Sequence, residues 1–383
     1  MIVSVKADAK IGVQVKPRLL IVLPDLAAGG AQPMNLRLAR QLRLKGWEVN
    51  IAVLFDRPVA IKAEQLEELN IVQLRAKGLF EKARLPIRLA RLAVHSDIVV
   101  GGMEFASTNY GYFSARLARK PFISWIHSSI HRHQYATTVL DRYICQWVYK
   151  RLQWVILPSY GALDSFCRVV GSPSNHATWQ VIENFQDETS LNLNNPIPDC
   201  NACSKPVVVG VGRFVPVKCF DRLIRAHTEL RVQGIDHHLV LLGDGPQRET
   251  LSQLVRQMGV EHSVFMPGHV QDVRPWLNHS TIFALCSDYE GFSLVIIEAM
   301  QAGLPIVSMD CPSGPREILD GGRFGMLVPD RDEVSFQRAL AHLLTSPQQR
   351  NILSVLGKMR AKHYTADRIV PIWESLLHQV ARH

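Results

Sequence analysis

Short apolar runs alternate with amphipathic segments along most of the chain. In the first half, an apolar run at residues 18–23 is followed by an amphipathic segment at 33–45 and a second apolar run at 49–55. The second half repeats this order at 206–211, 220–232 and 238–242. Strands that alternate with helices predict an α/β fold with parallel sheets. We therefore expect two doubly wound, Rossmann-like domains that face each other across a cleft.

A segment of turn-forming residues separates the two patterned halves. Residues 187–205 are rich in Asn and Pro, which is typical of a linker. We expect a first domain at 1–190, a linker at 191–204 and a second domain that begins at 205.

Length and composition fit two domains of ordinary size. The chain has 383 residues, of which 47% are hydrophobic. No apolar run reaches the roughly 18 residues of a membrane span, and the charges near the N-terminus do not form a secretory pattern. Seven cysteines are too few for a disulfide framework, and Cys200 and Cys203 are expected to be reduced linker thiols. These features predict a cytoplasmic protein.

Charge is distributed unevenly between the halves. Residues 1–190 contain 24 Lys and Arg against 15 Asp and Glu, whereas residues 191–383 contain 19 of each kind, so the first half carries the whole net charge of +9. Such a surplus favours an anionic partner, for example a phospholipid surface, a lipid-linked diphosphate or a nucleic acid. No zinc-finger or RNP motif accompanies it. We therefore expect an anionic membrane surface or acceptor, and no nucleic acid.

One segment of the first half has the composition of an interfacial helix. At 80–94, one helical stripe carries Arg84, Arg88 and Arg91, and the adjoining stripe carries Leu85, Leu89 and Leu92. A basic amphipathic helix of this kind can lie on an anionic membrane. The alternative is an ordinary surface helix that packs its Leu stripe on the sheet. With the charge surplus, the pattern suggests a peripheral protein on the cytoplasmic face of the inner membrane.

The segment at 281–307 carries the strongest chemical signal. An apolar strand at 281–286 leads into a polar loop, a helix is expected to begin near Ser293 or Leu294, and Gly303 ends it. Gly291 allows close backbone approach to a ligand, and the unpaired amides of 292–294 at the helix start favour phosphate. This places a phosphate site at the carboxyl edge of the sheet, where open α/β sheets bind ligands.

Two carboxylates flank that expected phosphate site. Glu290 lies in the loop, and Glu298 lies in the second turn of the helix. Because carboxylates repel phosphate, their partners are expected to be hydroxyl groups, as in a nucleotide sugar. The alternative is that Glu290 only interacts with the helix dipole and that Glu298 forms a surface ion pair.

Further candidates follow other predicted strands. Arg213 and Lys218 share the loop that begins at Gly212, and two cations on one loop can neutralise a diphosphate from two sides. Gly30, after Gly29, lies between a strand and a helix, which suits either close approach to phosphate or a plain tight turn. His127 ends a strand and could contact a sugar hydroxyl or a phosphate, or be structural.

Taken in order, these motifs resemble those of the retaining glycosyltransferases of family 4. Glu290 and Glu298 match the Glu-x7-Glu motif of that family, and Gly212, Arg213 and Lys218 resemble its diphosphate clamp. Residues 29–31 resemble its first glycine loop, 181–184 its interdomain element, and 364–377 the closing helix that crosses back to the first domain. The resemblance implies a GT-B fold, a second domain at 205–363 and a crossing helix within 364–383. It also implies sugar transfer with retained configuration.

The resemblance also implies a role for each residue. Arg213 and Lys218 would bind the donor diphosphate, Glu298 the ribose and Glu290 the hydroxyls of the transferred sugar. The amides of 292–294 would bind the distal phosphate. The full set of expected site residues is His127, Arg213, Lys218 and Glu290 as catalytic, and Gly30, Gly212, Val270, Gly291, Phe292, Ser293, Leu294 and Glu298 as donor-binding, with Val270 near the base. Gln32 stands where many members have Glu, so Gly30 is preferred at that loop.

No cofactor or metal is expected besides the nucleotide-sugar co-substrate. Asp330 and Asp332 form an Asp-x-Asp, but their place before a helical pattern indicates capping. Residues 310–319 resemble those of members that use UDP-hexoses or UDP-N-acetylhexosamines, which favours UDP over GDP. The expected acceptor is a glycan or a lipid-linked sugar. A nucleotide-sugar epimerase with the same fold, or a non-catalytic membrane-associated binder, remains an alternative.

Overall fold

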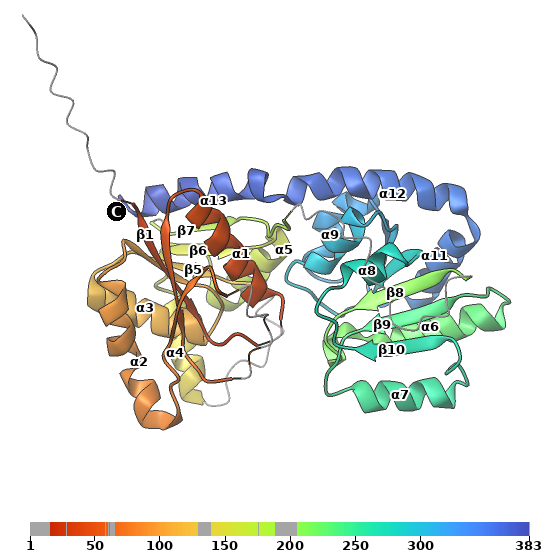
Figure 1. The fold of residues 1–383 in the computed structure, drawn as a ribbon, viewed down its shortest axis with the longest axis horizontal. Coiled ribbons are helices and arrows are strands. Elements are labelled where there is room, and N and C mark those ends of the chain that lie inside the picture. Colours follow the sequence, from red (N-terminus) through yellow and green to blue (C-terminus); the bar gives the residue numbers. More distant parts are fainter. Residues whose placement is uncertain are drawn as a thin grey trace, which may run out of the picture.

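The computed structural model describes residues 16–27, 29–57, 59, 61, 66–128, 139–174, 176–187 and 205–382. Two α/β domains lie side by side (Figure 1), which confirms the fold class expected from the sequence. The linker predicted at 191–204, with Cys200 and Cys203, lies outside the described residues.

The first domain is built on a parallel sheet with the strand order β3-β2-β1-β4-β5-β6-β7. Its strands are β1 (Arg18–Leu23), β2 (Glu48–Val53), β3 (Asn70–Gln73), β4 (Ile98–Gly101), β5 (Phe122–Trp125), β6 (Trp154–Leu157) and β7 (Thr178–Val181). Because successive side chains of a strand point to opposite faces, the apolar residues of β1 are shared between two cores. Leu19 and Ile21 belong to one core, and Leu20 and Val22 belong to the other.

Helices cover both faces of this sheet. One face is covered by α1 (Ala31–Leu44). The other face is covered by α2 (Gly78–Ala93), α3 (Ala106–Ala118), α4 (Val139–Tyr149) and α5 (Tyr160–Val170). In α2, the buried residues Leu85, Leu89 and Ala93 recur every fourth position, so one side of the helix faces the sheet.

The second domain repeats this plan with the strand order β10-β9-β8-β11-β12-β13. The strands are β8 (Val207–Val211), β9 (His238–Leu242), β10 (Val264–Gly268), β11 (Ile282–Leu285), β12 (Ile306–Met309) and β13 (Met326–Val328). On one face lie α6 (Phe220–Val232), α7 (Arg248–Gln257) and α11 (Glu333–Thr345). On the other lie α8 (Arg274–Asn278), α9 (Leu294–Gln301) and α10 (Pro315–Ile318). The bounds expected for α6 and β9 are confirmed.

Both sheets are arranged to leave a crevice at the carboxyl ends of their strands. In the first sheet, β1 lies between β2 and β4, and in the second, β8 lies between β9 and β11. The loops after two such neighbouring strands lead to opposite faces of the sheet, which opens a crevice between them. The two crevices belong to different domains, and the residues that line them are described below.

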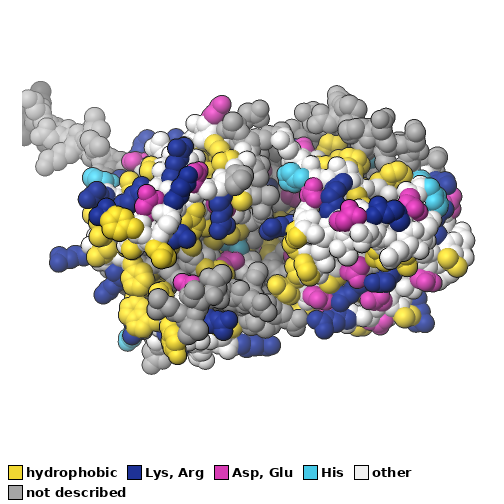
Figure 2. Space-filling model, turned by 90° about the horizontal axis from the view of Figure 1, so that it is seen from below, with side chains coloured by type: hydrophobic (Ala, Val, Ile, Leu, Met, Phe, Trp, Pro, Cys, Tyr) yellow, Lys and Arg dark blue, Asp and Glu magenta, His cyan; other side chains and the backbone are white. Residues whose placement is uncertain are grey.

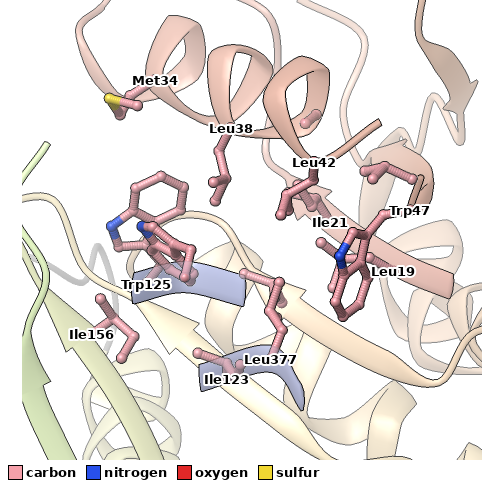
Figure 3. Close-up of a cluster of buried hydrophobic side chains, with 14 of the residues drawn as sticks. Leu19, Ile21, Met34, Leu38, Leu42, Trp47, Ile123, Trp125, Ile156 and Leu377 are labelled. Carbon is pink, nitrogen blue, oxygen red and sulfur yellow. The ribbon is translucent and has the colours of Figure 1, made fainter. Parts of the chain in front are cut away.

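The C-terminal helices connect the two domains. α12 (Pro347–Ala361) packs on α9, and α13 (Ala366–Val380) packs on the first domain, so the pair runs along one side of the molecule (Figure 1). The ring of Trp373 in α13 lies 4.5 Å from that of Trp125, measured between centroids. Leu377 packs among Leu42 and Trp47 of the first-domain core (Figure 3). None of the helices in the described part of the chain is both long and apolar enough to cross a membrane.

Candidate active site

A cavity of about 810 Å³ lies between the two domains. Its walls are formed by loops that follow strands of both sheets, and all of the site residues expected from the sequence line it. These residues are Gly30, His127, Gly212, Arg213, Lys218, Val270, Glu290, Gly291, Phe292, Ser293, Leu294 and Glu298. The structure therefore brings together residues that are up to 268 positions apart in the chain.

Lys218 and Glu290 form an ion pair in the wall of this cavity. Lys218 ends the 3-10 turn Pro216–Lys218 after β8, and its Nζ lies 2.6 Å from Oε1 of Glu290. The hydroxyl of Ser287 donates to the same oxygen at 2.7 Å. The charge of Lys218 and the Ser287 hydroxyl stabilise the ionised carboxylate of Glu290 in its largely buried position. Arg213, on the same loop, is exposed and forms no ion pair with another described residue.

The loop that leads into α9 presents unpaired amides to the cavity. α9 begins at Leu294, as expected, and Ser293 caps it in a left-handed conformation with φ of 67°. The amides of Phe292, Ser293 and Leu294 donate no hydrogen bond to another described residue. The Ser293 hydroxyl is buried and likewise has no partner among those residues. Because the first amides of a helix point along its axis and carry partial positive charge, this loop is suited to binding a phosphate.

Gly291 has a structural role that the sequence did not reveal. A Cβ atom at this position would lie 1.9 Å from the carbonyl oxygen of His127, which belongs to the first domain. The hydroxyl of Ser159, at the start of α5, donates to the carbonyl oxygen of Gly291 at 2.9 Å. The sequence assigned this glycine to the close approach of a ligand. In the structure, the first domain itself makes the close approach, and only glycine leaves room for it.

Glu298 lies in the second turn of α9 and faces the first domain. Its Oε1 accepts a hydrogen bond of 2.6 Å from the side-chain amide of Gln186, which lies after β7. Burial raises the pKa of Glu298, while the charge of Arg37 and the hydrogen bond from Gln186 oppose this rise. The residue therefore forms contacts between domains and is not a surface ion pair.

His127 occupies the first-domain wall, just after β5. Its backbone N–H donates to Oε2 of Glu104 at 3.0 Å, and the hydroxyl of Ser128 donates to Oε1 of Glu104 at 2.7 Å. Its ring Nε2 lies 3.3 Å from Nδ2 of Asn35, which also donates to the carbonyl of Gly102 at 2.7 Å. The same Nδ2 also donates to the carbonyl of Ala31 at 2.9 Å, so its two hydrogens are used by the two backbone carbonyls.

The electrostatics of His127 restrict its chemistry. Burial lowers its pKa to about 4, although the negative charge of Glu104 opposes the shift. The imidazole is therefore neutral near pH 7. A neutral ring suits a sugar hydroxyl, whereas the cationic side chains of the lining are those of Arg37, Arg213 and Lys218.

The glycine loop before α1 also lines the cavity. Gly30 and Pro33 contribute to its wall, and Gly30 is the residue that precedes the first turn of α1. The side-chain amide of Gln32 donates to Oδ1 of Asp25 at 3.0 Å, and Asp25 also pairs with Arg57 at 2.8 Å. Gln32 is thus engaged inside the first domain and does not line the cavity.

The far end of the cavity lies beside β9 and β10. Val270 and Val273 line it together with residues 243–245, which follow β9. A Cβ on Gly243 would lie 1.9 Å from the carbonyl oxygen of Gly212, so the two loops pack backbone to backbone. Val270 and Val273 give this end the apolar surface expected near a base, and Asp244 lies among the same lining residues.

The Asp-x-Asp motif lies elsewhere and is part of a helix cap. Oδ1 of Asp332 accepts from the amide of Ser335 at 2.9 Å, where Asp332 caps α11. This confirms the expected capping role. Neither Asp330 nor Asp332 lines the cavity.

Several residues of the cavity wall were not identified from the sequence. Arg37, Glu104 and Ser128 are three of them. Asn35 and Gln186, which do not line the cavity but lie against His127 and Glu298, were also not identified. Glu104 follows β4 at the carboxyl edge of the sheet, and that position could have indicated it. Arg37 lies within an amphipathic helix, and its sequence context does not distinguish it from an ordinary surface arginine.

The protein has two doubly wound domains with a cavity between them. Cations, unpaired helix amides and carboxylates line this cavity, which is the GT-B arrangement of sugar-transferring enzymes. A likeness to solved structures supports the fold: HepE of Anabaena in complex with UDP superposes with a TM-score of 0.76 at 18% identity, over 95% of this chain and 100% of that one.

Two family models match successive parts of the chain. "Glycosyltransferase Family 4" matches residues 28–188, and "Glycosyl transferases group 1" matches residues 205–346. The chain belongs to the family 4 glycosyltransferases, as the sequence motifs implied.

Relatives support the same assignment. An uncharacterized glycosyltransferase of Haemophilus influenzae is 28% identical over 205 residues, but the match covers only 52% of this chain and 57% of that protein. The N-acetylgalactosamine-N,N'-diacetylbacillosaminyl-diphospho-undecaprenol 4-alpha-N-acetylgalactosaminyltransferase of Campylobacter jejuni is 24% identical over 92% of this chain and 97% of that protein.

Proposed function

We propose that this glycosyltransferase moves a hexose or N-acetylhexosamine from a nucleotide sugar to a glycan or lipid-linked acceptor, with retention of the anomeric configuration. The observation that carries the proposal is one cavity whose lining brings Arg213, Lys218 and the unpaired amides of 292–294 together with Glu290 and Glu298. Positive groups beside two carboxylates match a ligand that carries both a diphosphate and sugar hydroxyls.

The residues suggest how the reaction would proceed. The bond between the anomeric carbon and the phosphate oxygen breaks, and a new bond forms from that carbon to the acceptor oxygen on the same face. The departing phosphate takes the proton of the acceptor hydroxyl. Arg213, Lys218 and the helix amides stabilise the charge that develops on the diphosphate, which is the largest contribution such a site can make. The path needs no protein nucleophile, and Lys218 and Ser287 already engage Oε1 of Glu290.

Several observations support the choice of substrates. The resemblance of residues 310–319 to UDP-sugar enzymes favours UDP over GDP, and HepE was solved with UDP. The name of the Campylobacter jejuni relative describes transfer to a sugar on diphospho-undecaprenol, which supports a lipid-linked acceptor. The proposed reaction requires no metal, because Arg213 and Lys218 supply the positive charge. Unchanged activity in excess chelator would support this, and strict dependence on manganese would contradict it.

We also propose that the basic first domain lies on an anionic membrane surface. In α2, the Leu stripe expected at the interface is instead turned inward, because Leu85 and Leu89 are fully buried against the sheet. A different face of α2 exposes Leu79 and Phe80, which are 88% and 66% accessible. The guanidinium of Arg84 lies 3.9 Å from the centroid of the Phe80 ring.

The apolar and basic surface extends beyond α2. α2 packs along α3, and α3 contacts α4, on which Tyr143 and Trp147 are exposed. Arg151 lies 4.0 Å from the centroid of the Trp147 ring. Hydrophobic and basic side chains gather on the same face of the first domain (Figure 2). Exposed aromatic rings beside arginines are the combination that interfacial binding needs. Equal flotation with neutral and with anionic vesicles would contradict this part of the proposal.

A ligand screen followed by a product assay tests the function. Thermal shifts are measured with UDP- and GDP-sugars, because a ligand at 100 times its Kd adds about 2.7 kcal/mol of stability. The stabilising donor is then incubated alone and with lipid-linked and free glycan acceptors, and products are identified by mass spectrometry. Transfer with retained configuration supports the proposal. An isomerised donor would indicate an epimerase, and binding without any turnover would indicate a non-catalytic protein.

A further inference from the structure

The carboxylate of Glu298 is held by residues from outside its own domain. Glu298 belongs to α9 of the second domain, but its hydrogen bond of 2.6 Å comes from Gln186, which lies at the end of the first-domain chain after β7. Gln186 is itself fixed, since its backbone N–H donates to the carbonyl of Tyr364 at 2.8 Å. The amide of Gln186 therefore engages one oxygen of the carboxylate from a defined direction.

Arg37 is a second residue that acts on this carboxylate, through its charge and not through a direct ion pair. It lies on α1 of the first domain and lines the cavity together with Glu298. Its Nε lies 4.0 Å from Oδ2 of Asp187, and its buried Nη1 has no hydrogen-bond partner among the described residues. The charge of Arg37 acts favourably on ionised Glu298. A largely buried arginine with an unpaired nitrogen is costly, so its position is expected to serve the cavity.

Gln186 and Arg37 leave one oxygen of the Glu298 carboxylate available to accept hydrogen bonds from a diol. An ionised carboxylate only accepts hydrogen bonds, and its two oxygens can accept several. Gln186 uses one position on Oε1 and Arg37 supplies positive charge nearby, so Oε2 remains for hydroxyl donors. Vicinal ribose hydroxyls are two such donors on adjacent carbons. A protonated Glu298 would have fewer acceptor positions to offer them.

We propose that Arg37 and Gln186 are positioning residues that favour the ionised form of Glu298 and direct it at the ribose of the donor nucleotide, so that the ribose site is complete only when both domains are together. This inference rests on the proposed function, in which Glu298 binds the ribose. Neither residue needs to touch the nucleotide. Both act through the carboxylate, and both belong to the part of the chain that precedes the second domain.

The test compares the affinity for UDP with the affinity for 2′-deoxy-UDP by calorimetry. A hydrogen bond to a charged group is worth about tenfold or more in affinity, so the wild type is expected to prefer UDP by that factor. Glu298→Gln is expected to remove most of the preference. Arg37→Met and Gln186→Leu are expected to weaken UDP binding about tenfold while affecting 2′-deoxy-UDP less, so that the ratio of the two Kd values falls toward one.

Controls separate positioning from general damage. Arg37→Lys keeps the positive charge and is expected to restore part of the preference. Arg43→Met changes an exposed arginine on the same helix and is expected to leave both Kd values unchanged. Thermal unfolding of each variant shows whether it folds, and the Kd ratio is insensitive to the fraction of active protein.

The outcomes distinguish the two proposals. If the wild type binds neither UDP nor GDP, the proposed function is wrong. If it binds GDP instead, the same ratio is measured with GDP and 2′-deoxy-GDP. If Glu298→Gln removes the preference for the ribose hydroxyl but Arg37→Met and Gln186→Leu keep it, the positioning role is wrong and the proposed function stands.

Discussion

Nζ of Lys218 lies 2.6 Å from Oε1 of Glu290, although the sequence motifs assign these residues to different parts of the donor. Lys218 is expected to bind the diphosphate and Glu290 the transferred sugar. With these expected roles, the ion pair would place the scissile bond of a bound donor next to both residues. The charge of Lys218 would then be shared between Glu290 and the departing phosphate.

Removal of Lys218 is expected to slow turnover strongly. Loss of one donor to a developing oxyanion costs about 3 kcal/mol, or roughly a hundredfold in rate. Lys218→Met also removes the ammonium that pairs with Glu290, whose side chain is only 9% exposed. We therefore expect Lys218→Met and Glu290→Gln to be non-additive in kcat, as in a double-mutant cycle for two residues in contact. Strictly additive effects would show that the pair does not act together.

Arg213 is expected to contribute to the same step by a different contact. It is exposed and forms no ion pair with another described residue, so its guanidinium is available to a phosphate. Arg213→Ala is expected to lower kcat about a hundredfold. Arg213→Lys should recover only part of this, because an ammonium cannot form the two parallel hydrogen bonds of a guanidinium. Arg225→Ala on α6, where the arginine forms a surface pair with Asp221, is the control and is expected to leave kcat unchanged. Full activity of Arg213→Ala would contradict the assignment.

Gly291 gives a test of the contact between the domains. A Cβ here would lie 1.9 Å from the carbonyl oxygen of His127 and 3.1 Å from Cα of Ser128, and backbone atoms cannot yield as a side chain can. Gly291→Ala is therefore expected to push the donor loop away from the first domain and to lower kcat at least tenfold. Because the second-domain core is untouched, the variant should still unfold cooperatively when followed by circular dichroism. Activity equal to that of the wild type would mean that the domains need not approach this closely during turnover.

The sequence predicted which residues form the site better than it predicted the contacts between the two domains there. The expected site residues line one cavity because the loops after parallel strands gather at the carboxyl edge of each sheet, and both of these edges contribute to the cavity. Their grouping at each edge needs only the order of strands and loops. The contact between Gln186 and Glu298 joins residues 112 positions apart, in different domains. Periodicity describes what each helix buries within its own domain. It carries no information about how two domains approach, so Arg37, Gln186 and the role of Gly291 were found only in the structure.

The second domain contains a buried histidine pair that should make stability depend on pH. Nδ1 of His227 lies 2.9 Å from Nε2 of His237, whose Nδ1 lies 2.8 Å from the carbonyl of Ile235. A carbonyl only accepts, so the proton of His237 is on Nδ1 and its Nε2 must accept from His227. Nε2 of His227 lies 2.9 Å from the hydroxyl oxygen of Ser263, which itself donates to the carbonyl of Val260 at 3.1 Å. Both imidazole rings are buried, which disfavours a positive charge on either of them.

Acid is therefore expected to destabilise the protein through this pair. Burial lowers the pKa of His227 to about 2, and it also lowers that of His237, whereas an unfolded histidine titrates near 6.5. A depressed pKa in the folded state means that the unfolded chain binds protons first. Stability is full above about pH 6.5 and falls below it by up to about 1.4 kcal/mol per pH unit for each such group. Urea unfolding at pH 7 and pH 5 measures this loss.

Variants show whether the loss of stability in acid comes from His227 and His237 or from the rest of the molecule. The pKa of His127 is also lowered, so this residue contributes to the loss of stability in acid. The contribution of the pair is therefore measured by comparing variants with the wild type. His227→Gln removes one of the titrating groups, and we expect a smaller fall in unfolding free energy between pH 7 and pH 5 than in the wild type. His342→Gln replaces an exposed histidine and should leave the fall unchanged. An identical fall in all three proteins would show that the buried pair does not govern the acid sensitivity.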